Sequence, residues 1–479
     1  TKEENDNFFK DGKFINPHNI YGGGNLACKV TGVATVEVLK GMTPFELLET
    51  QQWKSSYTDN KNPHFSVFGG GYGANTQVGS TDVTVNVEGD YGVYDAEVDD
   101  NTDQLARPHT KNNKNKARKA ARSGTSEQKD NNTLPVFDNS KGIPNFTVLG
   151  VLGGGYAGTV IDSTLVTVDG QPFLRRVYGG GFGDPDATSE NDATGLVGGD
   201  AKVYIKGAKI YGDVFGGGAG VAPKSTSDTS NPYTYFTKVA RVNGTAMVKI
   251  SDDAKVYGNV YGGGDMANVG EAITDRPANY YASLPTSESE IDQSTAAFKS
   301  YTATNYKTFV NIIGGDIYGE VFGGGKGLKK EKAPEYQKVG RINGNTLVHV
   351  ANTNNAEFST EVIDPEDNAI PYVWSRIYGG CAYGVGERNT PLHIEGGMLG
   401  LNIFGGGYGD VPITDDQTTE TIGESTNMKT LQQVLGKKCD SQDVTYANIL
   451  GNTKVQIDGG SWIWNRKADI NGNITTWTG

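Results

Sequence analysis

The sequence predicts an all-β protein built as a parallel β-helix solenoid of about nine coils. Three observations support this fold class: a recurring glycine triplet, a short alternating strand between successive triplets, and insertions confined to two places in the repeat. Glycine makes up 67 of 479 residues, about twice its usual share. The hydrophobic content of 36% is low for a compact globule. It suits the thin core and large surface of a solenoid.

The glycine triplet closes each predicted coil. It begins at Gly22, Gly69, Gly153, Gly179, Gly216, Gly262, Gly323 and Gly405, and a ninth copy reads Gly379-Gly380-Cys381. Two hydrophobic residues precede it, usually a β-branched residue and then an aromatic one, as in Val214-Phe215. The shortest interval, 26 residues from Gly153 to Gly179, suits one coil of two or three short strands. Because coil corners need a positive φ or a close backbone approach, we expect columns of glycine there.

A short alternating run, such as Val203-Tyr204-Ile205, forms the first strand of the unit. Its period of two is typical of a strand with one buried face. A glycine turn and a second strand follow, the latter predicted from Ile210 to Phe215. A shorter apolar segment precedes the first strand, as in Val242-Asn243-Gly244. We expect the following first-strand residues to be buried and stacked in register: Val85, Val87, Val166, Val168, Val203, Ile205, Val248 and Ile250.

Residues 1–479 are predicted to form a single β-helix domain. Its insertions fall at about 40–65, 89–145, 184–196, 221–238, 268–308, 351–372 and 410–446. They follow either the triplet or the first strand, which favours stacked coils because extra residues leave a solenoid only at its corners. Helix signals at 43–57 and 428–435 predict short helices within them. The chain starts with Thr and ends within a repeat, so we expect a piece of a longer polypeptide.

Charge and cysteine content exclude several classes. A formal net charge of −13 argues against nucleic acid as a partner. No apolar run of about 18 residues predicts a membrane span. Three cysteines, Cys28, Cys381 and Cys439, are too few for a disulfide-rich scaffold. Cys381 is predicted to be a buried free thiol, and a disulfide with Cys439 is the alternative.

No cofactor or metal site is predicted. The glycine-rich corners lack both nucleotide-binding motifs, and the segment 406–410 lacks the nine-residue period of calcium-binding β-rolls. His349 and His393 occupy the same position in neighbouring coils and are expected about 4.8 Å apart. A metal pair is one interpretation. Two exposed strand histidines are the favoured one, because no third ligand is evident.

A polar column precedes the apolar-aromatic pairs. It consists of Asn19, Ser66, Gly150, Arg176, Asp213, Asn259, Glu320, Arg376 and Asn402. Stacking in register places Arg176 beside Asp213 and Glu320 beside Arg376. This favours charge pairing between coils over two carboxylates that face a substrate. We therefore predict no catalytic residues.

Strand parity places aromatic residues on both sides of the polar column, facing outward if the Ile, Gly and Val positions face the core. Aromatic rows of this kind suit stacking on sugars or binding a partner. The predicted ligand-binding residues are Trp374, Arg376, Tyr378, Tyr318, Tyr257 and Tyr211. The alternative is that the long insertions fold over these rows and cover them.

The apolar-aromatic-Gly-Gly-Gly corners, as in Val177-Tyr178 before Gly179, resemble the large glycine-triplet repeat proteins on the surface of gut Bacteroidetes. The resemblance runs from Ile20 to about Trp464 and carries over no site residues. It implies an adhesin-like, extracellular or bacterial cell-surface protein. We thus expect a non-enzymatic protein that presents loops and an aromatic face to a glycan or to a host or bacterial surface protein. The alternatives are a polysaccharide-degrading β-helix lyase or glycoside hydrolase, and a tailspike-like fibre.

Overall fold

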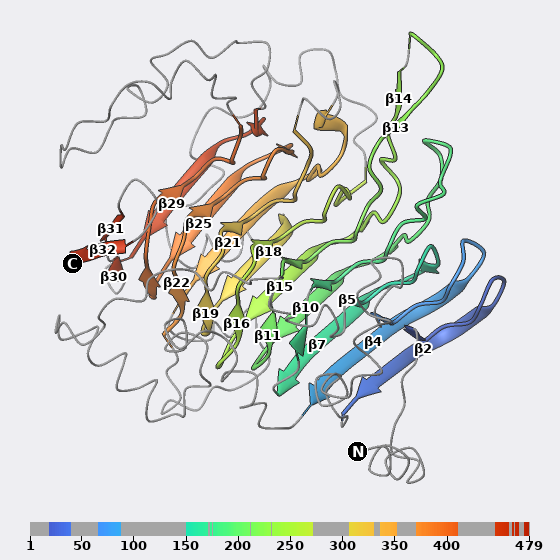
Figure 1. Cartoon of the computed structure of the whole chain (residues 1–479), viewed down its shortest axis with the longest axis horizontal. Coiled ribbons are helices and arrows are strands. Elements are labelled where there is room, and N and C mark those ends of the chain that lie inside the picture. The colour runs from blue at the N-terminus through green and yellow to red at the C-terminus, as the bar shows by residue number, and fades with distance from the viewer. Residues whose placement is uncertain are drawn as a thin grey trace, which may run out of the picture.

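The computed structural model is a stack of parallel β-coils (Figure 1). It describes residues 19–39, 66–87, 150–170, 173–174, 176–210, 212–230, 232–271, 306–329, 336–351, 370–410, 446–458, 462–463, 465–468 and 474–478. The coils follow one another in chain order, from blue to red in Figure 1. The predicted parallel β-helix is confirmed.

Three long parallel sheets run along the stack. The first sheet contains β2 (Lys29–Val38), β4 (Gln77–Val87), β7 (Thr164–Gly170), β10 (Ala201–Ile205), β15 (Ala246–Ile250), β18 (Tyr306–Ile312), β21 (Asn345–Val350), β25 (Thr390–Ile394) and β29 (Thr453–Ile457), with β6 (Thr159–Val160) beside β4. The second sheet contains β8 (Phe173–Leu174), β11 (Lys209–Ile210), β16 (Lys255–Val256), β19 (Asp316–Ile317), β22 (Tyr372–Val373), β26 (Met398–Leu399) and β30 (Trp462–Ile463). The third sheet contains β1 (Asn19–Tyr21), β3 (Ser66–Phe68), β5 (Gly150–Leu152), β9 (Val177–Tyr178), β12 (Val214–Phe215), β17 (Val260–Tyr261), β20 (Val321–Phe322), β23 (Ile377–Tyr378) and β27 (Ile403–Phe404).

The inward residues of the three sheets form one continuous core of Val, Ile, Leu and Ala side chains. Val203 pairs with Val166 and Val248, as the repeat predicts. One coil differs, because Val85 pairs with Val168 and Val87 with Gly170. The first-strand run of this coil is therefore Val83-Thr84-Val85, which begins two residues earlier than the predicted run from Val85 to Val87.

A threonine hydrogen bond explains the register of that coil. Residues 81–87 alternate throughout, so the pattern alone permits two alignments. Thr81 Oγ1 donates to the carbonyl of Gly153 at 2.6 Å. Thr164 and Thr308 lie at the same position of later coils. Each donates to the carbonyl oxygen of the first glycine in the triplet that follows it, Gly179 and Gly323. This bond ties the first sheet to the triplet corner and selects one alignment.

The predicted second strand from Ile210 to Phe215 is two strands, β11 and β12, in different sheets. The chain bends between them at Gly212, and at Gly258 and Gly319 in the next two coils. A Cβ atom added to Gly258 would run into the carbonyl of Gly212. The strand parity used to place the aromatic residues therefore does not extend across the bend.

The triplets are glycine because neighbouring coils approach closely. A Cβ atom on Gly217 would lie 2.6 Å from the amide nitrogen and 2.9 Å from the Cα of Gly264. The seven described glycines with positive φ all lie outside the triplets. Of the two expected reasons for glycine corners, close approach applies to the triplets and positive φ does not.

Cys381 replaces the third glycine of its triplet and is a buried free thiol, as predicted. Cys439 lies outside the described residues, as do the two predicted helices at 43–57 and 428–435. The described part contains one helical turn, the 3-10 helix Tyr336–Lys338. None of its helices is long and apolar enough to cross a membrane.

Of the predicted insertions, 184–196 is described completely and 221–238 except for one residue. The second of these contains the antiparallel hairpin of β13 (Lys224–Ser225) and β14 (Tyr233–Thr234), which projects from the stack in Figure 1. Two further strand pairs complete the described elements: β24 (Val385–Gly386) with β28 (Asn448–Ile449), and β31 (Asn465–Ala468) with β32 (Ile474–Thr478).

Candidate functional site

An aromatic column runs along the outer side of the third sheet. From Tyr178 to Phe404 each ring stacks on the next, with centroids 4.7 to 4.9 Å apart. The spacing follows from the sheet, whose strands lie about 4.8 Å apart. Both faces of the interior rings are therefore covered by neighbouring rings. The interior rings are also buried, and only Phe404 at the end of the column is exposed. A ligand therefore has no open ring face to stack on in the interior of this column.

A second, separate stack contains Tyr257, Tyr318 and Trp374. Tyr257 and Tyr318 are 4.9 Å apart, and Tyr318 and Trp374 are 5.9 Å apart. This stack packs with Tyr372 and Met398 of the second sheet. Trp374 is 9% exposed. Because of the bend at the Gly212 position, the expected single face is divided in two.

The six predicted ligand-binding residues are thus divided between two places. Tyr257, Tyr318 and Trp374 are in the second stack. Arg376 and Tyr378 lie beside each other at the start of β23, in the polar and aromatic columns. Tyr211 lies outside the described residues.

The polar column joins neighbouring coils. Arg376 donates from Nη1 to Glu320 Oε1 at 2.8 Å, which confirms the predicted pairing. The Asn259 side chain accepts from the backbone amide of Glu320 at 2.7 Å. Asp213 accepts in the same way from the amide of Asn259 at 2.8 Å. Polar side chains in this column therefore hold one coil to the next.

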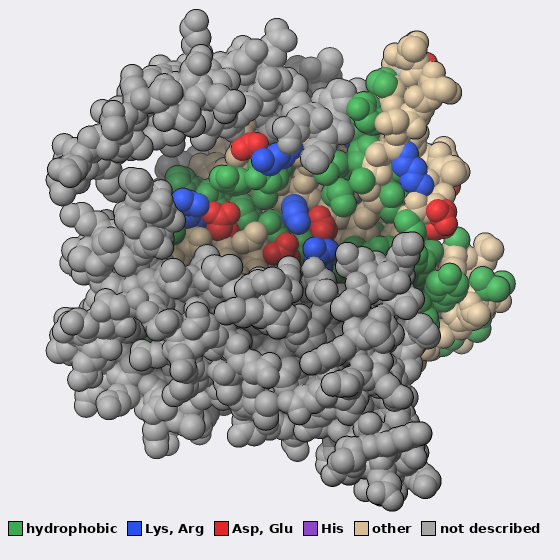
Figure 2. Space-filling view, viewed as in Figure 1, with side chains coloured by type: hydrophobic (Ala, Val, Ile, Leu, Met, Phe, Trp, Pro, Cys, Tyr) green, Lys and Arg blue, Asp and Glu red, His purple; other side chains and the backbone are tan. Residues whose placement is uncertain are grey.

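Charged side chains from another position lie over the aromatic column. Lys326 Nζ is 3.5 Å from Asp213 Oδ2 and 3.8 Å from Asp265 Oδ1. The same ammonium group lies 5.7 Å from the ring centroid of Phe215 and 6.0 Å from that of Tyr261. Such distances give a cation–π contact. The mixing of charges is visible in Figure 2, where acidic and basic side chains of the described residues lie among hydrophobic ones.

Burial raises the pKa of Asp265, and the positive charge of Lys326 partly opposes this shift. Neither Asp265 nor Lys326 was expected at this face. Each directly follows a glycine triplet, at a position where other coils carry Ala219 and Ala382. Their place after the triplet is the sequence signal that could have identified them.

A histidine cluster lies on the outer side of the first sheet. His349 on β21 pairs with His393 on β25, and their ring centroids are 5.7 Å apart. The predicted neighbourhood is confirmed, but the predicted exposure is wrong, since the two residues are 2% and 1% exposed. Polar groups from adjacent coils surround the rings. His349 Nδ1 is 2.9 Å from Asn311 Oδ1, and His393 Nε2 is 2.6 Å from Asp458 Oδ2.

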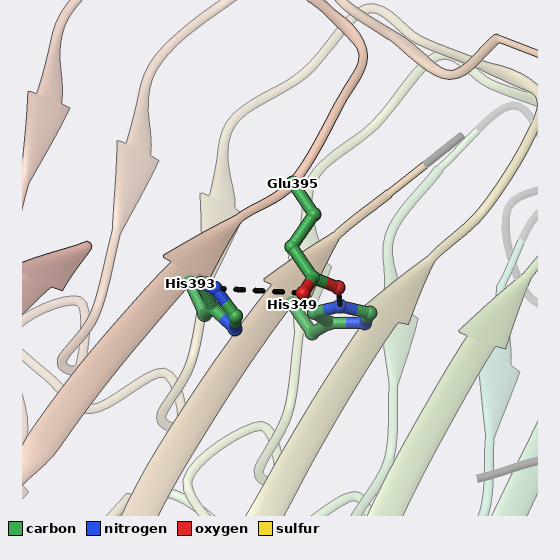
Figure 3. Close-up of side chains that lie close together, drawn as sticks. All are labelled: His349, His393 and Glu395. Carbon is green, nitrogen blue, oxygen red and sulfur yellow. Dashed lines mark hydrogen bonds and ion pairs between the residues drawn. The ribbon is translucent and has the colours of Figure 1, made fainter. Parts of the chain in front are cut away.

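Glu395 supplies the third group that the sequence reasoning did not find. Its Oε2 is 2.7 Å from His349 Nε2, and its Oε1 is 3.7 Å from His393 Nε2. Figure 3 shows the carboxylate reaching both rings from the end of β25. One ligand atom from each of the three residues lies within 4.8 Å of the other two. Two imidazoles and a carboxylate can hold a metal ion or share protons.

Comparison of the chain with family models, with curated proteins and with solved structures finds no match.

Proposed function

We propose that this chain is a non-enzymatic, adhesin-like scaffold of the extracellular or cell-surface type, which binds a glycan or a surface protein. Its binding face is the outer side of the third sheet, together with the segments between coils. The observation that carries the proposal is charge pairing between coils. Glu320 is bound by Arg376, and Asp213 and Asp265 share Lys326.

Paired charges favour binding over catalysis. Glycoside hydrolysis generally uses two carboxyl groups about 5 to 10 Å apart, with the scissile bond between them. Here an ammonium group lies between Asp213 and Asp265. Carboxylates held in this way form a fixed, polar surface that requires little reorganisation when a partner binds.

Arg376 is the residue best placed to contact a partner. Its side chain is 45% exposed, although one guanidinium nitrogen is bound to Glu320. The other donors of its planar fork remain suitable for a carboxylate or sugar hydroxyls. Tyr378, two residues later, is only 4% exposed. Arg376, more than the buried Tyr378 and Trp374, is therefore the centre of the proposed face.

A glycan array with the intact chain tests the proposal, followed by titration of the glycans that bind. Arg376→Ala is expected to weaken binding by at least about tenfold, the loss typical of a central interface residue. Arg388→Ala removes another exposed arginine and is the matched control. A bound glycan that yields no new reducing ends supports a binding protein. Equal binding by both variants would place the site elsewhere.

One observation favours the alternative, a polysaccharide-degrading enzyme. Asp265 has a raised pKa and lies with Asp213 around one ammonium group. Two neighbouring carboxyl groups in different environments are the arrangement of an acid and its partner in glycosidases. Release of reducing ends by the wild-type chain, abolished in Asp265→Asn, would establish this activity and refute the non-enzymatic proposal.

A further inference from the structure

We propose that His349, His393 and Glu395 bind one divalent transition-metal ion, of which zinc fits the donor set best. The site is independent of the proposed binding face, since it lies on the first sheet instead of the third. The donors are two ring nitrogens and one carboxylate, all within 4.8 Å of one another. Zinc sites combine imidazole and carboxylate ligands in this way, and three protein ligands leave one position open.

Asn311 orients the first imidazole for this role. Its Oδ1 lies 2.9 Å from His349 Nδ1. An amide oxygen and a carboxylate oxygen both accept hydrogen bonds, so both ring nitrogens of His349 face acceptors. With a metal ion on Nε2, Nδ1 would keep the proton and donate it to Asn311 Oδ1, and Glu395 would bind the same ion. In metal sites the second ring nitrogen of a histidine ligand is usually held by a carbonyl or carboxylate in this manner.

Asp458 lies next to the second imidazole. Its Oδ2 is 2.6 Å from His393 Nε2, and it occupies the position after β29 that Glu395 occupies after β25. Its distance allows it to act as a fourth ligand after a small rotation. The four groups come from three successive coils, so an ion bound here would connect β21, β25 and β29.

The competing explanation is that protons occupy the cluster in place of a metal. His349 would then carry protons on both nitrogens, between Asn311 and Glu395. The charge of that imidazolium, on a ring that is 2% exposed, would be balanced by the Glu395 carboxylate. A divalent ion would instead lie between two neutral rings and the carboxylate. The metal titrations below distinguish the two explanations.

The test uses the chain after removal of metal by a chelator, titrated with Zn²⁺ by calorimetry and with Co²⁺ by absorption spectroscopy. One ion per chain is expected, with a rise in melting temperature. The Co²⁺ complex should show the intense visible bands of a four- or five-coordinate site. Absence of stoichiometric binding, or a Co²⁺ spectrum typical of six oxygen ligands, would overturn the proposal.

Variants locate the ion. Glu395→Gln and His393→Gln each remove one donor and should weaken Zn²⁺ binding by at least about a hundredfold. Asn311→Ala should weaken it by about 10 to 100-fold, as expected for a residue that orients a ligand. Glu37→Gln is the matched control, because Glu37 is exposed on β2 at the repeat position of His393 and its replacement removes the same charge as Glu395→Gln.

Undiminished binding in Glu395→Gln and His393→Gln would mean that other residues hold the ion, and would also overturn the proposal. Thermal melts without metal check that each variant is folded. If a variant does not fold, the Co²⁺ spectrum and the stoichiometry of the wild-type chain decide the question alone.

Discussion

Phe215 and Tyr261 lie in neighbouring coils with ring centroids 4.7 Å apart and ring planes 6° from parallel. The distance is that between neighbouring strands, so each ring sits directly over the next. A large rotation of one coil relative to the next would slide the rings apart. Aromatic stacking and the close contact of the glycine triplets therefore favour the same straight arrangement of coils.

Removal of an interior ring should strongly destabilise the fold. Phe322 is 1% exposed and stacks on Tyr261 at 4.9 Å and on Tyr378 at 4.8 Å. We expect Phe322→Ala to lower the free energy of unfolding by about 3 to 5 kcal/mol. Phe404→Ala is the control, because Phe404 is 39% exposed and, among the described residues, stacks on Tyr378 alone. Its loss should be less than half as large in urea denaturation. Equal losses would contradict a role for stacking on both faces.

A methyl group on a triplet glycine should destabilise only where another glycine triplet packs against it. The middle glycine Gly217 faces Gly264 at 2.6 Å from an added Cβ atom, whereas Gly406 has nothing within 4 Å. We expect Gly217→Ala to cost about 1 to 3 kcal/mol, the usual range for overpacking. Gly406→Ala should change stability by less than about 0.5 kcal/mol. Thermal melts measure both, and a harmless Gly217→Ala would refute the close-approach explanation.

Cys381 should resist thiol reagents in the folded protein. Burial raises the pKa of its thiol from the ordinary value of 9.0 to about 12. Because the thiolate is the reactive form, the raised pKa makes it much scarcer at neutral pH than in an ordinary cysteine. Iodoacetamide at pH 8, followed by mass mapping, should label the half-buried Cys28 first. Cys381 should be labelled only in denaturant. Labelling of both at equal rates under native conditions would show that the Cys381 corner opens.

The sequence alone predicts much of the fold, because the glycine triplets show where each coil turns. The contact between Glu320 and Arg376 follows from counting back from each triplet. The bend at Gly212 was not predicted, since alternation continues through it and only the packing of successive coils reveals it. The register of Val85 also differs from the prediction, because the hydrogen bond from Thr81 that selects it depends on a residue of the next triplet.

The histidine cluster shows a different limit. Glu395 follows His393 by two residues and so lies on the same side of the strand, which is a signal that the sequence does contain. Asp458 holds the equivalent place in the next coil. Burial of the rings could not be predicted, because it depends on side chains from several coils meeting at one point. The contact of Lys326 with Asp213 likewise requires the distance between coils that are two apart in the stack.

The Arg376–Glu320 pair should contribute little to stability. The two side chains are 45% and 20% exposed, so solvent screens their attraction. Exposed pairs of this kind are worth about 0 to 1 kcal/mol. A double-mutant cycle with Arg376→Met and Glu320→Gln, measured by urea denaturation, should give a coupling energy in that range. A coupling above about 2 kcal/mol would assign the pair to structure, and would make any effect of Arg376→Ala on binding uninterpretable.

Asp265→Asn should stabilise the fold, and increasingly so as the pH rises. Burial raises the pKa of Asp265 above 3.8 in the folded state, so the folded chain holds this proton more tightly than the unfolded chain. Between the two pKa values the folded state binds more protons, and wild-type stability falls as the pH increases. Asparagine does not titrate and avoids this loss. The stability gap between variant and wild type should therefore be small at pH 3 and reach its maximum above the folded-state pKa.

Urea denaturation from pH 3 to pH 8 measures this gap. Titration of the other carboxyl groups affects both proteins equally and cancels in the difference. Asp186→Asn, at an exposed position, is the control. If Asp265→Asn destabilises the chain at pH 7, attraction to Lys326 outweighs the cost of burying the carboxylate.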